Sequence, residues 1–308
     1  MSKKFLAVML LVSFCITNSY GQKSMNKGKS KNWKAQHVML IGLDGWGAYS
    51  MEKADMPVLK ELMKNGAYTL KKRSVLPSSS AANWASMFMG AGPELHGYTE
   101  WGSKTPELPS RELNKHGIFP TVFSLLREAV PTAEMGVMYE WDGIKYLVDT
   151  LSVNYHAQAI ESEKNPTLLT EMAVKYLKEK KPTLSAIVFD NPDHVGHSIG
   201  HNTPEYYQKL HELDGYIGKI INGLKESGMY DNTIIIFSSD HGGINKGHGG
   251  KTMLEMESPF IITGKNIKKG YVINESMMQF DIASTIAYVF NLKQPQVWIG
   301  RPVTQVFK

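Results

Sequence analysis

The chain has 308 residues, of which 42% are hydrophobic and 20% charged, and its formal net charge is +5. This is an ordinary globular composition, and about 280 residues can bury one large core or two smaller ones. The only cysteine, Cys15, lies in a segment predicted to be removed. The mature protein therefore has no disulfide, thiol nucleophile or thiolate metal ligand.

Residues 1–21 are predicted to be a signal peptide. Two lysines precede a 12-residue apolar run, Phe5–Ile16, and the small residues Ser19 and Gly21 offer a cleavage site. The run is too short to span a bilayer comfortably. We therefore expect an exported protein, periplasmic or secreted, with no stable membrane span after cleavage. An uncleaved anchor is the alternative, and a lipid anchor at Cys15 is disfavoured because the bulky Phe14 precedes it.

Residues 22–36 carry five lysines and no acid. This composition predicts a disordered, basic leader before the fold. Such a short run of charge is more typical of a solvated segment than of a nucleic-acid site, so no nucleic-acid partner is inferred.

Strand-like and helix-like segments alternate from residue 37 onward. Hydrophobic periodicity predicts strands over Val38–Leu43, Tyr68–Leu76, Met135–Tyr139, Leu184–Phe189, Ile234–Phe237 and Pro259–Thr263. Between and after them it predicts helices over Met56–Asn65, Asn83–Met89, Phe119–Ala129, Thr167–Lys178, Pro204–Glu226 and Asp281–Phe290. Between these elements, Tyr98–Ile118 is expected to be a loop near the site.

Apolar strands that alternate with amphipathic helices predict the α/β class. We expect a three-layer α/β/α sandwich with a mainly parallel sheet, because both faces of such strands must be covered. No internal repeat or second domain is visible, so residues 37–308 are predicted to form one catalytic domain. Ligands of such folds bind at the carboxyl ends of the strands.

Six acidic and imidazole residues lie at or near those strand ends. They are Asp44, Asp193, His197, Asp240, His241 and His248. Asp193 and His197 stand four residues apart, so on one helical turn they share a face and can hold one ion together. Carboxylates and imidazoles at strand ends indicate a site for two divalent metal ions.

Each signal also has an ordinary explanation. Asp44 precedes a glycine and could be a turn residue, Asp240 could cap a turn, and a histidine between glycines, like His248, is usually exposed. By spacing, His194 and His201 compete as ligands. The set as a whole favours a metal site, because these separate explanations would otherwise all have to hold at once.

A serine cluster, Ser78-Ser79-Ser80, precedes a predicted helix. Serine caps helices well, which is the simpler explanation. A hydroxyl at a helix N-terminus also faces the amides that favour a phosphate, so Ser80 is a candidate nucleophile. Asn83, three residues later, is a candidate donor to a phosphoryl oxygen.

These motifs resemble, in order, the alkaline phosphatase superfamily, and most closely its type I phosphodiesterase/nucleotide pyrophosphatase branch. The matching segments are Gly42-Leu-Asp44-Gly45, Pro77-Ser-Ser-Ser80-Ala-Ala-Asn83, Pro192-Asp193-His-Val-Gly196-His197, Ser239-Asp240-His241-Gly242 and Gly247-His248-Gly249. The resemblance extends from Val38 to Val303. It departs at Ser80-Ala81-Ala82, where the branch often has threonine followed by Phe-Pro.

The resemblance implies a site with two divalent ions, expected to be Zn²⁺. One ion would be bound by Asp193, His197 and His248. The other would be bound by Asp44, Asp240 and His241, with Ser80 as metal contact and nucleophile and Asn83 as phosphate ligand.

The function implied is hydrolysis of a small-molecule phosphate ester, with a nucleotide as one candidate, through a phosphoseryl intermediate. A phosphodiesterase/nucleotide pyrophosphatase is the first interpretation, with a phosphomonoesterase as the alternative and a phosphonate hydrolase or phosphate-transferring mutase as minor ones. A sulfatase is disfavoured, because Ser80 lacks the x-Pro-x-Arg that follows a formylglycine precursor. A catalytically dead binding module would keep the fold without two ions. Candidate walls of the substrate pocket are Trp84, Trp101, Tyr139 and Trp141.

Overall fold

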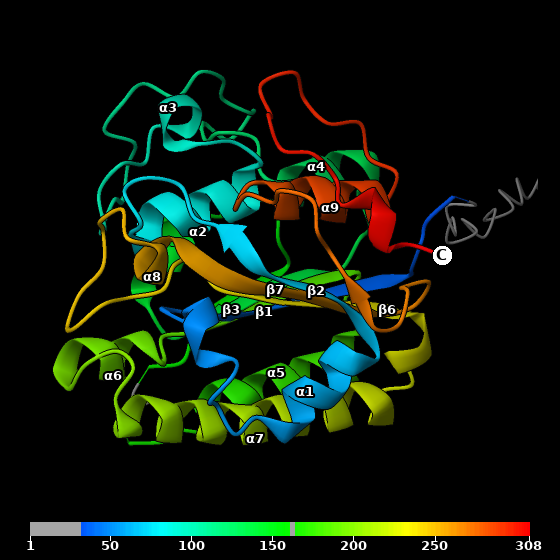
Figure 1. Cartoon of the computed structure of the whole chain (residues 1–308). Coiled ribbons are helices and arrows are strands. Elements are labelled where there is room, and N and C mark those ends of the chain that lie inside the picture. The colour runs from blue at the N-terminus through cyan, green and yellow to red at the C-terminus, as the bar shows by residue number, and fades with distance from the viewer. Residues whose placement is uncertain (1–31, 161–163) are drawn as a thin grey trace, which may run out of the picture.

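The structure, a computed structural model, describes residues 32–160 and 164–308 (Figure 1). The predicted signal peptide, Cys15 and most of the predicted leader lie outside the described residues. The last leader residues, 32–36, pack on the fold instead of being disordered. Ala35 is buried, and the ring of Trp33 lies 4.8 Å from that of Phe290. The prediction of disorder is therefore wrong for this end of the leader, where the apolar side chains of Trp33 and Ala35 pack on the core.

An eight-stranded sheet forms the centre of the molecule. Its strands are β1 (His37–Leu43), β2 (Gly66–Arg73), β3 (Met135–Tyr139), β4 (Tyr155–Gln158), β5 (Leu184–Phe189), β6 (Thr233–Ser238), β7 (Glu257–Gly264) and β8 (Tyr271–Val272). Their order is β4-β3-β5-β1-β6-β7-β2-β8. Only β7 runs antiparallel to its neighbours, β6 and β2. The prediction of a mainly parallel sheet is confirmed.

Helices cover both faces of the sheet. They are α1 (Pro57–Lys64), α2 (Ser80–Met89), α3 (Pro93–His96), α4 (Val122–Ala129), α5 (Leu168–Lys180), α6 (Asp193–Ser198), α7 (Pro204–Glu226), α8 (Met253–Met256) and α9 (Asp281–Val289). Figure 1 shows α1, α5 and α7 below the sheet and α2, α4 and α9 above it. In the described ranges, none of these helices has the length and apolarity to cross a membrane.

The two helical layers enclose two hydrophobic cores. Successive side chains of β1 point to opposite faces, so Val38 and Leu40 enter the core with α2, α4 and α9, whereas Met39 and Ile41 enter the core with α1, α5 and α7. Both faces of the central strand are thus shielded from solvent. This confirms the three-layer α/β/α sandwich.

Most predicted elements occur with small shifts at their ends. The strand predicted to reach Leu76 ends at Arg73, and the helix predicted from Phe119 begins at Val122, after a capping box formed by Thr121. The helix predicted from Asn83 begins at Ser80. The missed elements α3, α8, β4 and β8 have two to four residues, which is too short for a periodic pattern.

Candidate metal centre

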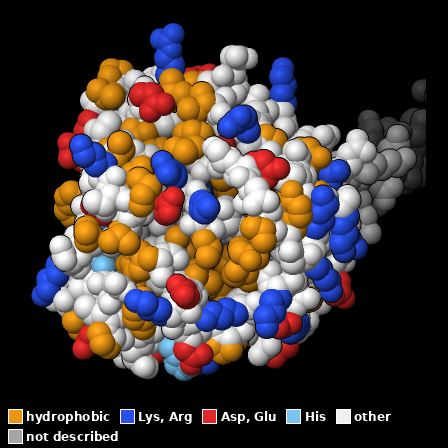
Figure 2. All heavy atoms as spheres, viewed as in Figure 1, with side chains coloured by type: hydrophobic (Ala, Val, Ile, Leu, Met, Phe, Trp, Pro, Cys, Tyr) orange, Lys and Arg blue, Asp and Glu red, His pale blue; other side chains and the backbone are white. Residues whose placement is uncertain are grey.

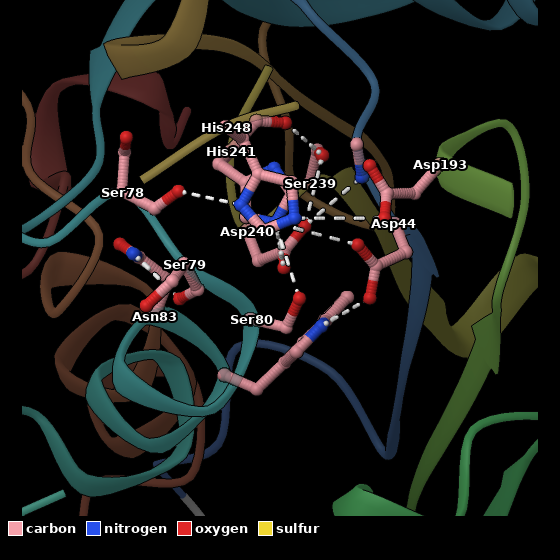
Figure 3. A network of polar contacts seen from close by, with 12 residues as sticks. Asp44, Ser78, Ser79, Ser80, Asn83, Asp193, Ser239, Asp240, His241 and His248 are labelled. Atoms are coloured by element: carbon pink, nitrogen blue, oxygen red, sulfur yellow. Dashed lines mark hydrogen bonds and ion pairs between the residues drawn. The ribbon is translucent and has the colours of Figure 1, made fainter. Parts of the chain in front are cut away.

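Three neighbouring parallel strands, β5, β1 and β6, end at the same edge of the sheet, and the predicted ligands follow them. The loops after β1 and β5 are joined by backbone hydrogen bonds. The amide of Asp44 donates to the carbonyl of Phe189 at 3.0 Å, and the amide of Asp193 donates to the carbonyl of Asp44 at 3.0 Å. The side chains drawn in Figure 3 converge at this edge.

Gly45 allows the two loops to meet. Its φ of +66° is in the left-handed region, and a Cβ there would lie 2.4 Å from Oδ1 and 2.9 Å from the backbone Cα of Asp193. Any other residue would be strained and would push Asp193 away. The Asp-Gly pair is therefore a turn, and the turn brings two carboxylates together.

One group of donor atoms comes from α6 and from the loop after β6. The Nε2 of His197 lies 3.1 Å from Oδ2 of Asp193 and 3.1 Å from Nε2 of His248. The Nε2 of His248 lies 3.7 Å from the same Asp193 oxygen. These three residues could hold one metal ion, and they are the set that the resemblance implies.

A second group surrounds the buried ring of His241. Its Nε2 lies 3.1 Å from Oδ2 of Asp240 and 3.5 Å from Oδ1 of Asp44. The donor atoms of Asp44, Asp193 and His241 lie within 4.8 Å of one another. Asp193 therefore borders both groups, which places them side by side. Asp240 also accepts from the amide of Gly45 through Oδ1 at 3.2 Å, so its Oδ2 is the free oxygen.

All three histidines are oriented in the same way. Each Nδ1 lies 2.8 to 3.0 Å from a backbone carbonyl oxygen. The acceptors are Gly242 for His241, Lys246 for His197 and Ser78 for His248. A carbonyl can only accept, so each Nδ1 carries a proton, and each ring in its neutral form would present the lone pair of Nε2 to the centre.

This donor set fits divalent cations. Oδ1 of Asp44, Oδ1 of Asp193 and Oδ2 of Asp240 are buried without a hydrogen-bond partner. Buried carboxylate oxygens need a partner, and the Nε2 atoms of His197 and His248, 3.1 Å apart, need a proton or a cation between them. Imidazole and carboxylate ligands without thiolate suit Zn²⁺ among other divalent ions.

The pKa values of these residues also show that the buried negative charge of the cluster is not balanced. Burial, with the nearby carboxylates of Asp240 and Asp193, raises the pKa of Asp44 well above its usual range. Burial alone would lower the pKa of His241, but Asp240 raises it to about 9. Burial and the neighbouring His241 lower the pKa of His248 to about 4. Without a cation, the site must therefore recruit protons to offset its buried charge.

The three serines before α2 have different contacts. Ser78 ties the His248 loop down, because its Oγ donates to the carbonyl of Gly250 at 2.6 Å and accepts from the amide of Gly249 at 3.1 Å. Ser79 is the N-cap residue, yet its buried hydroxyl has no partner. Ser80 opens α2, and its Oγ lies 3.2 Å from Nε2 of His241. The predicted nucleophile thus faces the second donor group.

The side-chain amide of Asn83 is already used in hydrogen bonds to the protein backbone, so it is not free to donate to a phosphate. It is fully buried, and its Oδ1 accepts from the amide of Val75 at 2.7 Å. Its Nδ2 donates to the carbonyls of Pro77 and Ser79, both at 3.0 Å. These contacts fold the serine loop. Donation from Asn83 to a phosphoryl oxygen stays a prediction, and it would require one of these bonds to be exchanged.

Among the four aromatic residues predicted as pocket walls, Trp101 lines a cavity beside the site. Tyr139 is buried in β3, and Trp141 packs against the core. Trp84 is buried below the site, where its Nε1 donates to Oδ2 of Asp44 at 2.9 Å. This contact with a candidate ligand has no signal in the sequence, because nothing local shows that α2 crosses the end of β1.

Two further histidines were considered as ligands. His194 is exposed and lies 3.9 Å from Asp190. His201 is buried against Gly196 and Gly243, with Nε2 3.5 Å from Oδ1 of Asp193. His201 makes no hydrogen bond to Asp193 and lies outside the two donor groups.

Known sequences and solved structures include relatives of this chain. The family described as type I phosphodiesterase / nucleotide pyrophosphatase matches residues 38–257. The chain is 26% identical to bis(5′-adenosyl)-triphosphatase enpp4 of Mus musculus over 227 residues, which are 70% of this chain and 49% of that protein. It is 26% identical to ectonucleotide pyrophosphatase/phosphodiesterase family member 1 of Homo sapiens over 216 residues, 67% of this chain and 23% of that protein. The chain thus spans half or less of the length of these curated relatives.

Among solved structures, murine ectonucleotide pyrophosphatase/phosphodiesterase 5, in an inactive form in complex with AMP, matches with a TM-score of 0.72. The identity is 16%, and the match covers 89% of this chain and all of that one. This likeness supports the alkaline phosphatase-like fold.

Proposed function

This chain belongs to the type I phosphodiesterase / nucleotide pyrophosphatase family, and on that premise we propose that it is a two-metal hydrolase of phosphoric esters. Its proposed substrates are phosphodiesters and the pyrophosphate bonds of nucleotides. The observation that carries the proposal is the convergence of three imidazole Nε2 atoms and three carboxylates on one strand edge beside the hydroxyl of Ser80.

Asp193, His197 and His248 would hold one divalent ion. Asp44, Asp240 and His241 would hold the other, together with the hydroxyl of Ser80. We propose Zn²⁺ for both ions. When bound, such a pair lowers the pKa of a coordinated hydroxyl or water and offsets charge at the phosphoryl centre.

Ser80 is the proposed nucleophile. Its Oγ attacks phosphorus in line, so that an Oγ–P bond forms while the P–O bond to the leaving alcohol breaks and the alcohol leaves on the side of His197 and His248. Water then attacks the phosphoseryl group, and the P–Oγ bond breaks to regenerate the serine. The N-terminus of α2 faces the phosphoryl oxygens, where its amides favour negative charge. Two in-line steps predict net retention of configuration at phosphorus.

The charge of the neighbouring cavity favours a diester over a monoester. A cavity of about 580 Å³ adjoins His197 and His248, and it is lined by Glu100 but by no lysine or arginine. A phosphomonoester dianion would find no cationic side chain there to balance its additional charge. A diester, with one charge and a second substituent, suits both the charge and the volume.

The decisive experiment compares kcat/KM of the zinc-loaded protein on bis(p-nitrophenyl) phosphate, p-nitrophenyl phosphate and p-nitrophenyl sulfate, which share one leaving group. We expect the diester to be preferred. A monoester preference above about tenfold, roughly 1.4 kcal/mol, would overturn the choice of substrate. A Ser80→Ala protein with near-normal turnover, or inversion at phosphorus, would exclude the phosphoseryl intermediate. Fewer than two ions per chain would favour a binding module without activity.

Export is part of the same proposal, since a signal peptide is predicted over residues 1–21. N-terminal sequencing of protein recovered outside the cytoplasm should begin at Gln22. A first residue of Met1 would identify an uncleaved anchor instead.

A further inference from the structure

Lys72 is a buried lysine that the proposed mechanism does not use. It lies in β2, where the flanking Lys71 and Arg73 are exposed but its own side chain is 0% exposed. Lysine is almost never fully buried unless its amine has polar partners. No aspartate or glutamate in the described ranges forms an ion pair with Lys72, so its hydrogen-bond partners must account for its burial.

The amine of Lys72 holds the peptide unit that leads into a candidate metal ligand. Its Nζ donates to the carbonyl of Ser239 at 2.7 Å and to Oε1 of Gln279. The carbonyl of Ser239 belongs to the peptide bond with Asp240. On the other side of this ligand, the hydroxyl of Ser74 donates to the carbonyl of Asp240 at 2.5 Å. The peptide units before and after Asp240 are thus both held by one short segment of the chain.

Gln279 extends these contacts to the helix of the proposed nucleophile. Its side chain is fully buried, and its Nε2 donates to the carbonyl of Ser239 at 3.2 Å and to the carbonyl of Asn83 at 3.4 Å. Asn83 lies in the first turn of α2, which begins at Ser80. The contact of 3.2 Å between Oγ of Ser80 and Nε2 of His241 joins the same two segments (Figure 3). Lys72 and Gln279 therefore connect the ligand turn to the start of α2 from below.

These bonds do not depend on the charge of the amine. Burial lowers the pKa of Lys72 to about 7, and the carboxylates of Asp240 and Asp281 counteract this shift. The ammonium has three N–H donors, and the neutral amine retains two, one for each acceptor. Lys72 can therefore hold the same two partners in either form, although a charged donor makes the stronger bonds.

We propose that Lys72 is a positioning residue for the second donor group. Together with Gln279, it fixes the turn that carries Asp240 and His241 against the first turn of α2. The two ligands are thereby placed for the second ion within reach of Ser80. This inference rests on the proposed function, because it takes the second ion and the nucleophile from there.

Lys72→Met tests the proposal through zinc affinity, which needs no turnover. Methionine is unbranched, one atom shorter and without a donor, and it packs readily in a buried position. The carbonyl of Ser239 would keep the longer bond from Gln279, so the turn should shift instead of unfolding. Competition with a chromophoric chelator should show one zinc ion bound about 10- to 100-fold more weakly, as is typical when a partner behind a metal ligand is lost. The other ion should keep near-normal affinity.

Two further variants identify the cause and the ion. Lys71→Met removes the same charge from the exposed neighbour on β2, and both zinc affinities should stay near normal. His197→Ala removes a ligand of the first ion, so the tighter zinc that remains reports on the second donor group. In that background, Lys72→Met should weaken the remaining zinc by the same factor.

Urea unfolding of the zinc-free proteins separates positioning from stability. A lysine that only stabilises the fold would lower the urea midpoint and leave both zinc affinities of the folded protein unchanged, and this result would overturn the proposal. An equal loss for both ions would also overturn it. If Lys72→Met does not fold, Gln279→Leu is measured instead, and it should weaken the same single ion; unchanged zinc affinities in that variant would overturn the proposal.

Hydrolysis of bis(p-nitrophenyl) phosphate by the wild-type protein separates this inference from the proposed function. A protein that hydrolyses the diester, but whose Lys72→Met variant binds both ions normally, loses this inference and keeps the proposed function. A protein in which Lys72→Met weakens one ion, but which hydrolyses no phosphate ester, keeps Lys72 as a positioning residue for a metal site and loses the proposed function.

Discussion

Trp84 offers the sharpest test of how the fold prepares the metal centre. Its Nε1 donates to Oδ2 of Asp44 at 2.9 Å, and both side chains are buried. This bond turns the other oxygen of Asp44, Oδ1, toward Nε2 of His241 at 3.5 Å. Trp84 is therefore a positioning residue that acts on a candidate ligand.

Trp84→Phe removes the donor and keeps an aromatic ring. A hydrogen bond to a charged group contributes roughly 1.5–3 kcal/mol, and its loss leaves a buried carboxylate oxygen unpaired. Loss of a comparable partner behind a metal ligand typically weakens metal affinity about 10- to 100-fold. We expect a loss in this range for one of the two zinc ions.

Trp46 provides a matched control. It is equally buried, but its Nε1 has no hydrogen-bond partner. Trp46→Phe therefore removes similar ring volume without removing a bond to a ligand. The difference between the two variants isolates the contribution of the hydrogen bond.

The measurement is zinc affinity by competition with a chromophoric chelator, with urea unfolding of the zinc-free proteins as the stability readout. Weakened zinc binding in Trp84→Phe and near-normal binding in Trp46→Phe would agree with the reasoning. Equal zinc affinities in the two variants would refute it, because ring volume would then account for the whole effect.

Three further predictions address the loop, the ions and pH. Asn83→Ala should lower the free energy of unfolding by about 2–3 kcal/mol, because its amide bonds to the backbone of the serine loop are lost; an unchanged urea midpoint would contradict this. Chelation should lower Tm, and zinc should restore it in a concentration-dependent way, because an ion that binds only the folded state stabilises that state; a Tm unaffected by a chelator would argue against the centre. Burial lowers the pKa of His96 to about 3. As the pH falls, the unfolded chain therefore protonates this histidine near pH 6.5, whereas the folded chain protonates it only near pH 3. The stability due to neutral His96 is present above pH 6.5 and falls toward pH 3 by at most about 1.4 kcal/mol per unit, and His96→Gln should lack this part of the loss.

Hydrophobic patterns within single segments of the sequence are enough to predict much of the fold. Runs such as Leu184–Phe189 and the spacing within Pro204–Glu226 give elements with the predicted ends. The alternation of strand and helix predicts a mainly parallel sheet, and parallel strands bring their carboxyl ends to one edge. That is sufficient to predict that Asp44, Asp193 and Asp240 meet.

The ends of elements and the short ones depend on more than periodicity. Thr121, which caps α4, shortens the predicted helix. The leader residues 32–36 are basic in composition, yet Trp33 and Ala35 find apolar partners that only the folded chain supplies. Charge alone therefore predicted too much disorder.

What the sequence by itself determined is the chemistry at the strand ends: carboxylates, imidazoles and a serine hydroxyl, with no cysteine after Cys15. The tertiary structure decided how these groups are shared and supported. It placed Asp193 between both donor groups, Trp84 under Asp44, and the Trp101 loop over the cavity. The physical reason is that periodicity reports the burial of one element at a time. Contacts between residues 40 or more positions apart, such as Trp84 and Asp44, depend on how the crossovers pack and how closely two backbones can approach.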